Sequence, residues 1–252
     1  MTTPTLTTIV LAAGKGKRLR SQLPKVIHKV AGRSLVAHVL DVVWVLGSQR
    51  VAIVVSKDGD PVRDAVGEAG FGDIDFVVQD PPNGTADAVR IAIAELGISD
   101  GHVLVVNGDM PLVRGETLQG LIDRAIGEGV AAAVLTASVD EPGDLGRVVR
   151  ADDGSLARIV EARDATDEEL EITEINCGAY VFDAALLALS IEKVDRENAQ
   201  GEFYLTDVVQ LFVSEGQRVE AHEASAEEGS GVNDRAGLSE VGALLRMRIC
   251  QR

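Results

Sequence analysis

Several residue types that would point to a secreted or membrane-spanning protein are scarce in this sequence. The 252 residues include only two cysteines, Cys177 and Cys250, which are too few and too widely separated for a disulfide framework or a zinc site. No apolar run approaches the roughly 20 residues that span a membrane. Residues 1–8 are polar, and the apolar run after them has only five residues, which is unlike a signal peptide. We therefore expect a cytoplasmic protein.

Basic residues are also scarce, except in one block. The formal net charge is −16, which argues against nucleic acid or an anionic membrane as a partner, because both select basic surfaces. Residues 1–40, however, contain no Asp or Glu. Their seven basic residues are Lys15, Lys17, Arg18, Arg20, Lys25, Lys29 and Arg33. This block predicts an anionic small-molecule ligand, and a solvated basic loop is the alternative interpretation.

Two familiar glycine motifs are missing from this block. A Walker loop needs a second Gly followed by Lys-Ser or Lys-Thr, and the dinucleotide fingerprint needs a third Gly where this chain has Leu19. What is present is a continuous apolar run at residues 9–13, which is typical of a strand buried on both faces. A glycine-rich loop starts at Gly14, and such loops bind phosphates at the carboxyl ends of strands in α/β proteins.

The pattern Leu-Ala-Ala-Gly-x-Gly-x-Arg-Leu, starting at Leu11 and followed by Pro24-Lys25, resembles the nucleotidyltransferases that build nucleotide sugars. It is most similar to the uridyltransferase domains of the bacterial bifunctional enzymes that make UDP-N-acetylglucosamine. The resemblance implies a nucleotide-binding loop and two cations that neutralise phosphates during catalysis. The matching nucleotide-binding positions are Leu11, Ala12, Ala13, Gly14 and Gly16, with the backbone of residues 14–17 as the phosphate cradle. The matching catalytic positions are Arg18 and Lys25.

The rest of the chain alternates between strand and helix patterns. Buried strands are expected at residues 51–55, 75–79, 102–106 and 131–136, and helices at 34–46, 61–69, 85–96 and 116–127. Ser34 is the expected cap of the first of these helices. This alternation predicts an α/β fold with a Rossmann-like, mostly parallel sheet and helices on both faces.

A loop at residues 79–88 follows one of the expected strands. Thr85 is a suitable cap for the helix after it, so a capped tight turn is one interpretation and a ligand site at a helix N-terminus is the other. The resemblance implies that Gln79, Gly84 and Thr85 contact the uracil base. The resembled motif is Leu-Gly-Thr-Gly-His-Ala, and this chain departs from it at Asn83, Ala86 and Asp87.

A second loop follows the strand at residues 102–106 and contains Asp109. Its carboxylate is a hard oxygen ligand that suits Mg²⁺ beside nucleotide phosphates, although an Asp bonded to its own turn is equally compatible with the local pattern. The resembled family carries its metal aspartate in the motif Gly-Asp-x-Pro-Leu. Residues 231–235 resemble the family's Gly-Val-Asn-Asn-Arg, which makes Asn233 the second metal ligand. We expect one or two Mg²⁺ ions.

Residues 140–204 depart from the regular alternation. An antiparallel hairpin is predicted at residues 147–150 and 156–161, and another strand at 174–182. The resemblance implies a small mixed lobe that binds N-acetylglucosamine phosphate through Gly146, Glu161, Asn176 and Tyr204, although each could equally be a solvent-facing hairpin residue. The expected nucleotide-binding core comprises residues 1–139 and 205–237, and its last strand is expected at 218–222. A C-terminal helix at 238–252 follows the core.

The resemblance covers essentially the whole chain, but only the N-terminal half of the bifunctional enzyme. It implies transfer of a uridylyl group from UTP to N-acetylglucosamine 1-phosphate, with release of pyrophosphate. The alternatives are the same chemistry on another triphosphate and sugar or polyol phosphate, and a binding protein without turnover. No hexapeptide repeat is present, so we expect no acetyltransferase activity.

Overall fold

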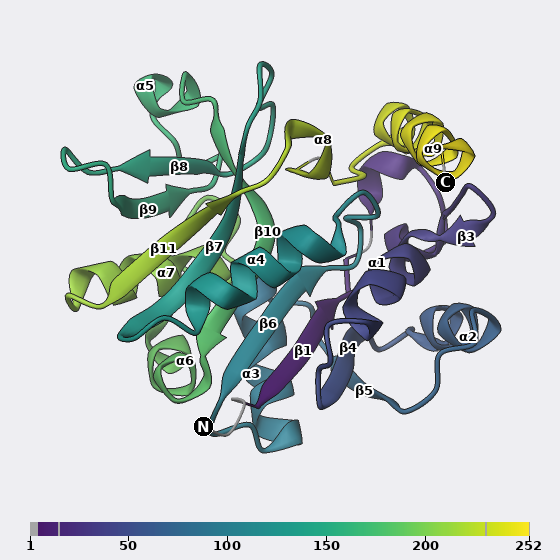
Figure 1. The fold of residues 1–252 in the computed structure, drawn as a ribbon, viewed down its shortest axis with the longest axis horizontal. Coiled ribbons are helices and arrows are strands. Elements are labelled where there is room, and N and C mark those ends of the chain that lie inside the picture. Colours follow the sequence, from purple (N-terminus) through teal and green to yellow (C-terminus); the bar gives the residue numbers. More distant parts are fainter. Residues whose placement is uncertain (1–4, 15, 230, 252) are drawn as a thin grey trace.

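The computed structural model describes residues 5–14, 16–229 and 231–251. Its centre is a nine-stranded sheet in which seven strands follow the order β11-β7-β10-β6-β1-β4-β5 (Figure 1). The strands of this sheet are β1 (Leu6–Leu11), β4 (Arg50–Ser56), β5 (Ile74–Gln79), β6 (His102–Asn107), β7 (Val130–Ser138), β8 (Arg147–Arg150), β9 (Leu156–Val160), β10 (Glu174–Asp183) and β11 (Arg218–Glu223). The expected α/β fold with a mostly parallel sheet is confirmed, since β10 is antiparallel to both of its neighbours on this path and the other six strands run in one direction.

The helices lie on both faces of the sheet, as predicted. They are α1 (Leu35–Trp44), α2 (Asp60–Glu68), α3 (Thr85–Leu96), α4 (Gly115–Ala125), α5 (Asp167–Leu170), α6 (Ala184–Ser190), α7 (Leu205–Ser214), α8 (Ala226–Gly229) and α9 (Arg235–Cys250). Short elements complete the chain: the 3-10 helices η1 (Lys17–Leu19), η2 (Lys25–Ile27) and η3 (Ile191–Lys193), and the paired strands β2 (Lys29–Val30) and β3 (Arg33–Ser34). No helix in the described part of the chain is long and apolar enough to cross a membrane.

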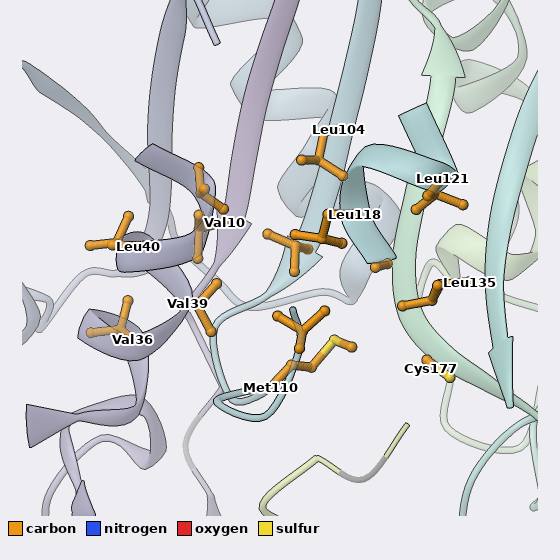
Figure 2. Close-up of a cluster of buried hydrophobic side chains, with 14 of the residues drawn as sticks. Val10, Val36, Val39, Leu40, Leu104, Met110, Leu118, Leu121, Leu135 and Cys177 are labelled. Atoms are coloured by element: carbon orange, nitrogen blue, oxygen red, sulfur yellow. The ribbon is translucent and has the colours of Figure 1, made fainter. Parts of the chain in front are cut away.

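The alternation of side chains along each strand produces two cores. On one face, α1, α2 and α4 pack over strand residues such as Val10 and Leu104, and Figure 2 shows this cluster with Val39 and Leu118 facing them. On the other face, α3, α6 and α7 cover the intervening strand residues, among them Val105. Because both faces are covered, the strands read as continuous apolar runs.

The first strand differs from its prediction. It begins at Leu6 and ends at Leu11, whereas the apolar pattern ran from residue 9 to residue 13. The strand can include Thr8, which is fully buried, because its hydroxyl is 2.7 Å from that of Ser48 and forms a hydrogen bond with it. Ending the strand at Leu11 leaves the glycine loop free to turn away at the carboxyl edge of the sheet.

Strand β10 lies inside the main sheet, between β6 and β7, although its residues fall within the 140–204 segment that the sequence assigns to a separate lobe. The β8–β9 hairpin and α5 protrude beside β7 and β10 as that segment's small projecting part (Figure 1). The antiparallel direction of β10 brings its first residues to the carboxyl edge of the parallel strands. Asn176 is therefore at the same edge as Asn107.

The C-terminal helix α9 packs against β2 in a small third core that contains Val232 and Val241. Asp234 caps this helix, because its side chain accepts a hydrogen bond from the N–H of Gly237 at 2.9 Å. The buried Val232 and the capped helix together hold the segment that carries Asn233 against the main domain.

Candidate active site

Two adjoining cavities open at the carboxyl edge of the sheet. The first, of about 470 Å³, is lined by the glycine loop and the loop after β5, and the second, of about 220 Å³, by β10 and by residues on either side of the β8–β9 hairpin. They share the lining residues Leu11, Thr85, Asn107 and Asp109. Ligands of open α/β sheets bind at this edge, which makes the first and the second cavity the candidate ligand sites.

The glycine loop is held by close packing against Lys25. Gly16 has φ +56°, and a Cβ at this position would lie 2.7 Å from the Cβ of Lys25, so only glycine fits. The N–H of Leu19 donates to the Gly16 carbonyl at 2.9 Å. Ala13 and Gly14 line the first cavity. The N–H of Ala12 donates a hydrogen bond to the Val54 carbonyl at 2.9 Å and is therefore engaged within the protein. Lys15, which belongs to the predicted phosphate cradle, lies outside the described residues.

Lys25 is the centre of the polar site. Its Nζ donates a hydrogen bond to Oδ1 of Asn233 at 2.8 Å and forms an ion pair with the carboxylate of Asp109. The side chains of Lys25 and Asp109 are only 16% and 15% exposed, so solvent screens this ion pair weakly. The N–H of Val232 donates to the Asp109 carbonyl at 3.0 Å, which fixes the two loops to each other.

The oxygens of Asp109 and Asn233 thus converge on one cation, the Lys25 ammonium. One carboxylate and one amide oxygen are ligands that Mg²⁺ accepts, provided that phosphate oxygens and water complete the octahedron. The described residues contain no group of three or more His, Cys, Asp or Glu side chains that could hold a metal without such help. The residues present therefore fit a metal that binds together with a phosphate ligand.

Arg18 lies at the mouth of the second cavity and pairs across it. Its guanidinium donates to Oδ2 of Asp144 at 2.6 Å, and both side chains are exposed. An exposed ion pair of this kind contributes little to stability. The guanidinium can therefore leave Asp144 for a phosphate at small energetic cost.

The loop after β5 is fixed to the segment before α7. Gly84 has φ +118°, and a Cβ there would collide with the backbone of Phe203. The N–H of Phe203 donates to the Asn83 carbonyl at 2.8 Å, and the N–H of Ala86 donates to the Phe203 carbonyl at 2.9 Å. These bonds shape one wall of the first cavity from two distant segments of the chain.

The prediction that Thr85 caps α3 is wrong. The helix begins at Thr85 itself, Gly84 occupies the N-cap position, and no side-chain cap bond forms there. Instead, the Thr85 hydroxyl oxygen accepts a hydrogen bond from the N–H of Leu205 at 3.0 Å, at the start of α7. Thr85 is thus one residue past the N-cap position, from which a hydroxyl accepts from the N2 or N3 N–H, and its hydroxyl bonds the neighbouring helix instead.

Gln79 is almost completely buried at the end of β5 and lines the first cavity. Its Nε2 donates to the Gly84 carbonyl at 3.0 Å and to Oδ2 of Asp87 at 2.9 Å. Asp87 is itself buried in the first turn of α3 and forms an ion pair with Arg90. Asp87 stood out in the sequence only as a departure from the resembled motif, and its contact with Gln79 was not predicted.

Three of the four predicted sugar-binding residues meet in the second cavity. They are Gly146, Glu161 and Asn176. Burial, followed by the nearby negative charges of Asp207 and Asp164, raises the pKa of Glu161, whose Oε1 accepts a hydrogen bond from Thr206 at 3.2 Å. Asn176 uses its amide to donate to the Tyr180 hydroxyl at 2.6 Å.

Tyr204, the fourth predicted residue, does not line the second cavity. It lines a neighbouring acidic hollow, where its hydroxyl accepts from Gln200 at 2.9 Å and is 3.3 Å from a carboxylate oxygen of Asp164. Glu161 and Thr206 line both this hollow and the second cavity. Tyr204 is thus one step removed from the cavity in which the other three residues meet.

Two residues that the sequence analysis did not select line these cavities. Asn107 lines both, and Gly178, with φ +81°, leaves room for its side chain, because a Cβ there would collide with the Asn107 amide. Thr206 lines the second cavity beside Glu161. Asn107 had the same signal as Asp109, a polar residue directly after a buried strand, and could have been found by it.

The chain is similar in sequence to a known protein family and to several curated proteins. Residues 7–229 match the family model described as "Nucleotidyl transferase". Similar curated proteins include the bifunctional protein GlmU of Corynebacterium diphtheriae, 43% identical over 96% of this chain and 51% of that protein. The GlmU proteins of Lactococcus lactis subsp. lactis and Geobacillus thermodenitrificans are 43% and 41% identical over 96% and 97% of this chain, and 52% of each. The chain spans about half the length of these relatives.

Proposed function

This chain belongs to the nucleotidyl transferase family, and we propose that it transfers the uridylyl group of UTP to N-acetylglucosamine 1-phosphate, releasing pyrophosphate. The observation that carries the proposal is the convergence of Lys25, Asp109 and Asn233 where the two cavities meet. A reaction between two phosphates needs positive charge and metal ligands at such a junction. The motif resemblance and the GlmU relatives support uridine and N-acetylglucosamine as the two halves of the product.

In this proposal each cavity takes one substrate. The nucleotide occupies the first cavity, between the glycine loop and the Gln79–Thr85 loop, and the sugar phosphate occupies the second, beside Gly146, Glu161 and Asn176. Asn and Glu side chains offer the hydrogen-bonding groups that sugar hydroxyls and an acetamido group require. The nucleotide half then corresponds to residues 1–139 and 205–237, and the sugar half to residues 140–204.

The chemistry is an in-line displacement at the α-phosphorus of UTP. A phosphate oxygen of the sugar phosphate forms the new P–O bond, and the bond to the pyrophosphate oxygen breaks on the opposite side. The chain has no nucleophile to supply, so its residues position the two substrates and offset their charge. Lys25 lies where charge accumulates at the α-phosphate, and Arg18, after leaving Asp144, is free to offset phosphate charge as well.

Nucleotidyl transferases generally use a divalent metal, and we assign Mg²⁺, as one or two ions, to Asp109 and Asn233. Bound there, Mg²⁺ would supply positive charge next to the phosphates, because the single carboxylate of Asp109 would not cancel the charge of the ion. UTP is a cytoplasmic metabolite, so the proposed reaction places the protein in the cytoplasm.

Pyrophosphate release, measured over a panel of nucleoside triphosphates and sugar 1-phosphates with Mg²⁺, tests this function. We expect the largest kcat/KM for UTP with N-acetylglucosamine 1-phosphate. A larger value for another pair would assign the enzyme to that pair, a possibility raised by Asn83, Ala86 and Asp87 beside the first cavity. Tight binding of UDP-N-acetylglucosamine without any pyrophosphate release would instead identify a binding protein.

A further inference from the structure

The side chain of Gln79 presents only part of its amide to the first cavity. Both hydrogens of Nε2 are directed at protein acceptors, one at the Gly84 carbonyl and one at Oδ2 of Asp87. No donor reaches Oε1 from the residues that the structure describes. The amide therefore offers a hydrogen-bond acceptor, and no donor, to a ligand in the cavity.

The orientation of the Gln79 amide follows from the chemistry of its two hydrogen-bond partners, the Gly84 carbonyl and the Asp87 carboxylate. A backbone carbonyl accepts and never donates, and the carboxylate of Asp87, paired with the Arg90 guanidinium, likewise accepts only. Turning the Gln79 amide over would place its oxygen against two other oxygens inside a buried site. The cost of such unpaired, opposed polar groups away from water fixes the orientation.

We propose that Asp87 is a positioning residue that holds the Gln79 carbonyl oxygen toward the nucleobase, and that this makes the site select a base with a ring N–H over one with a ring-nitrogen lone pair. The inference rests on the proposed function and specifies its base selectivity. Uracil carries such a donor, the imide N3–H between its two carbonyls. Cytosine has a lone pair on N3 in place of this N–H. Two hydrogen-bond acceptors, cytosine N3 and the Gln79 carbonyl oxygen, would then face each other without a hydrogen between them.

This positioning of the Gln79 amide depends on the residue type at position 87. The resembled motif has a histidine there, and a neutral imidazole can donate or accept depending on its tautomer. A carboxylate paired with Arg90 has no such freedom. Because thymine has the same imide N–H as uracil, the proposal concerns the distinction between imide and amino pyrimidines and not the 5-methyl group.

Binding of UDP and of CDP to the whole chain, measured by isothermal titration calorimetry, tests the role of Asp87. In Asp87→Asn, Arg90 still requires an oxygen, so the new NH₂ group turns toward Gln79. The Gly84 carbonyl alone then holds the Gln79 amide in its orientation, and giving up that one hydrogen bond lets the amide turn its own NH₂ group toward the base. We expect the wild-type preference for UDP over CDP, measured as the ratio of their dissociation constants, to fall by about tenfold or more. This is the change in affinity expected when one buried hydrogen bond between protein and ligand is lost.

Asp60→Asn is the matched control. Asp60 is also in the first turn of a helix, α2, and also faces an arginine three residues later, Arg63, at 3.9 Å. It lines neither cavity. Its substitution removes the same charge at an equivalent helix position, but on the exposed surface, and it should keep the wild-type ratio of the UDP and CDP dissociation constants.

Asp87→Glu keeps both acceptor oxygens and should retain a preference for UDP, and the melting temperature of each variant shows whether it is folded. An unchanged UDP to CDP ratio in a folded Asp87→Asn protein overturns the inference, as does an equal loss of both affinities. If Asp87→Asn does not fold, loss of the preference in a folded Asp87→Glu overturns it. Failure of the wild-type chain to release pyrophosphate from UTP would overturn the proposed reaction, whatever the binding ratio.

Discussion

Lys25 and Asn233 are 208 positions apart in the sequence, yet Nζ of one donates a hydrogen bond to Oδ1 of the other at 2.8 Å. The same ammonium pairs with Asp109, so residues from three separate segments of the chain meet at one point. This arrangement keeps the carboxylate neutralised before any substrate binds. It also keeps a cation in place beside the position proposed for the α-phosphate.

Replacing Lys25 should therefore slow the reaction and not merely weaken binding. We expect Lys25→Ala to lower kcat by about two to four orders of magnitude, because one preorganised charge donor to the transition state is lost. Steady-state pyrophosphate release at saturating substrates measures this. Lys29→Ala is the control, since Lys29 is in the same basic block but is exposed, with Glu68 3.9 Å away. A near-normal kcat in Lys25→Ala would remove Lys25 from the mechanism.

The proposed metal ligands should act as a unit. Asp109→Asn removes a charge and Asn233→Ala removes a dipole, so we expect the first to raise the Mg²⁺ concentration needed for half-maximal activity more than the second. Their effects on kcat/KM should be far from additive in the double variant, because both act through one ion. Mg²⁺ titrations of the two single variants and the double variant measure this, and additive losses would show that the two residues do not share a metal.

The sequence predicted the elements better than it predicted their contacts. Strand β6 was predicted from its apolar run, because covered strands have that pattern wherever they lie. The same kind of pattern identified β10 as a strand but carried no information about its partners, which are set by pairing with β6 and β7. Local reasoning placed the Thr85 hydroxyl on its own helix, whereas the structure gives it the N–H of Leu205, more than a hundred residues away.

The candidate site shows the same division. Asp109 could be proposed as a site residue because it lies in a loop directly after a buried strand. Lys25 could be proposed from its spacing to the glycine motif. Neither pattern indicated that the two side chains form an ion pair. Asp87 was visible only as an unexpected residue type, since its role depends on a side chain in the preceding strand, Gln79.

Asp207 should make stability depend on pH in an uncommon direction. Burial, followed by the charges of Asp195 and Asp164, raises its pKa to about 6, above the value of about 3.9 for an unfolded Asp. The folded chain then binds this proton more tightly than the unfolded chain. The ionised carboxylate therefore destabilises the fold above about pH 6, and this effect disappears below about pH 4.

Asp207→Asn should accordingly melt at a higher temperature than the wild type at pH 7 to 8, with the difference shrinking as the pH falls from 6 to 4. Thermal melts across this range measure it. Asp153→Asn is a contrasting variant, because hydrogen bonds from Ser155 lower the pKa of Asp153. It should show no gain in melting temperature at pH 7. A lower melting temperature for Asp207→Asn at pH 7 would contradict the assignment.

Glu228 should matter for both stability and metal binding. It is buried in α8, and its Oε1 accepts from the N–H of Arg114 at 2.9 Å and from the Thr117 hydroxyl at 2.6 Å, at the start of α4. Glu228→Ala leaves that N–H unpaired, and we expect a loss of about 1–3 kcal/mol in the free energy of unfolding. Since the segment with Asn233 follows α8 in the chain, the Mg²⁺ requirement should rise as well.

The adjacent Glu227 supplies the comparison. Its side chain is about half exposed and pairs with Arg248 at 3.1 Å. Exposed pairs of this kind contribute at most about 1 kcal/mol. Urea unfolding and Mg²⁺ titration of Glu227→Ala should stay close to the wild type, and equal effects of the two substitutions would exclude a special role for Glu228.

The antiparallel strand β10 has a consequence for how such a protein can diversify. Ser138 and Glu174 are partners in the β7–β10 ladder, so the chain leaves the sheet and re-enters it at one place. The projecting hairpin region between them starts and ends at neighbouring positions of the sheet, with further contacts from β8 to β10 and from β9 to α7. Such a segment can be lengthened, shortened or exchanged as a cassette while the ladder that anchors it stays in register. In an engineered chimaera, the proposed binding region for the acceptor substrate could therefore be changed while the loops proposed to bind the triphosphate remain as they are.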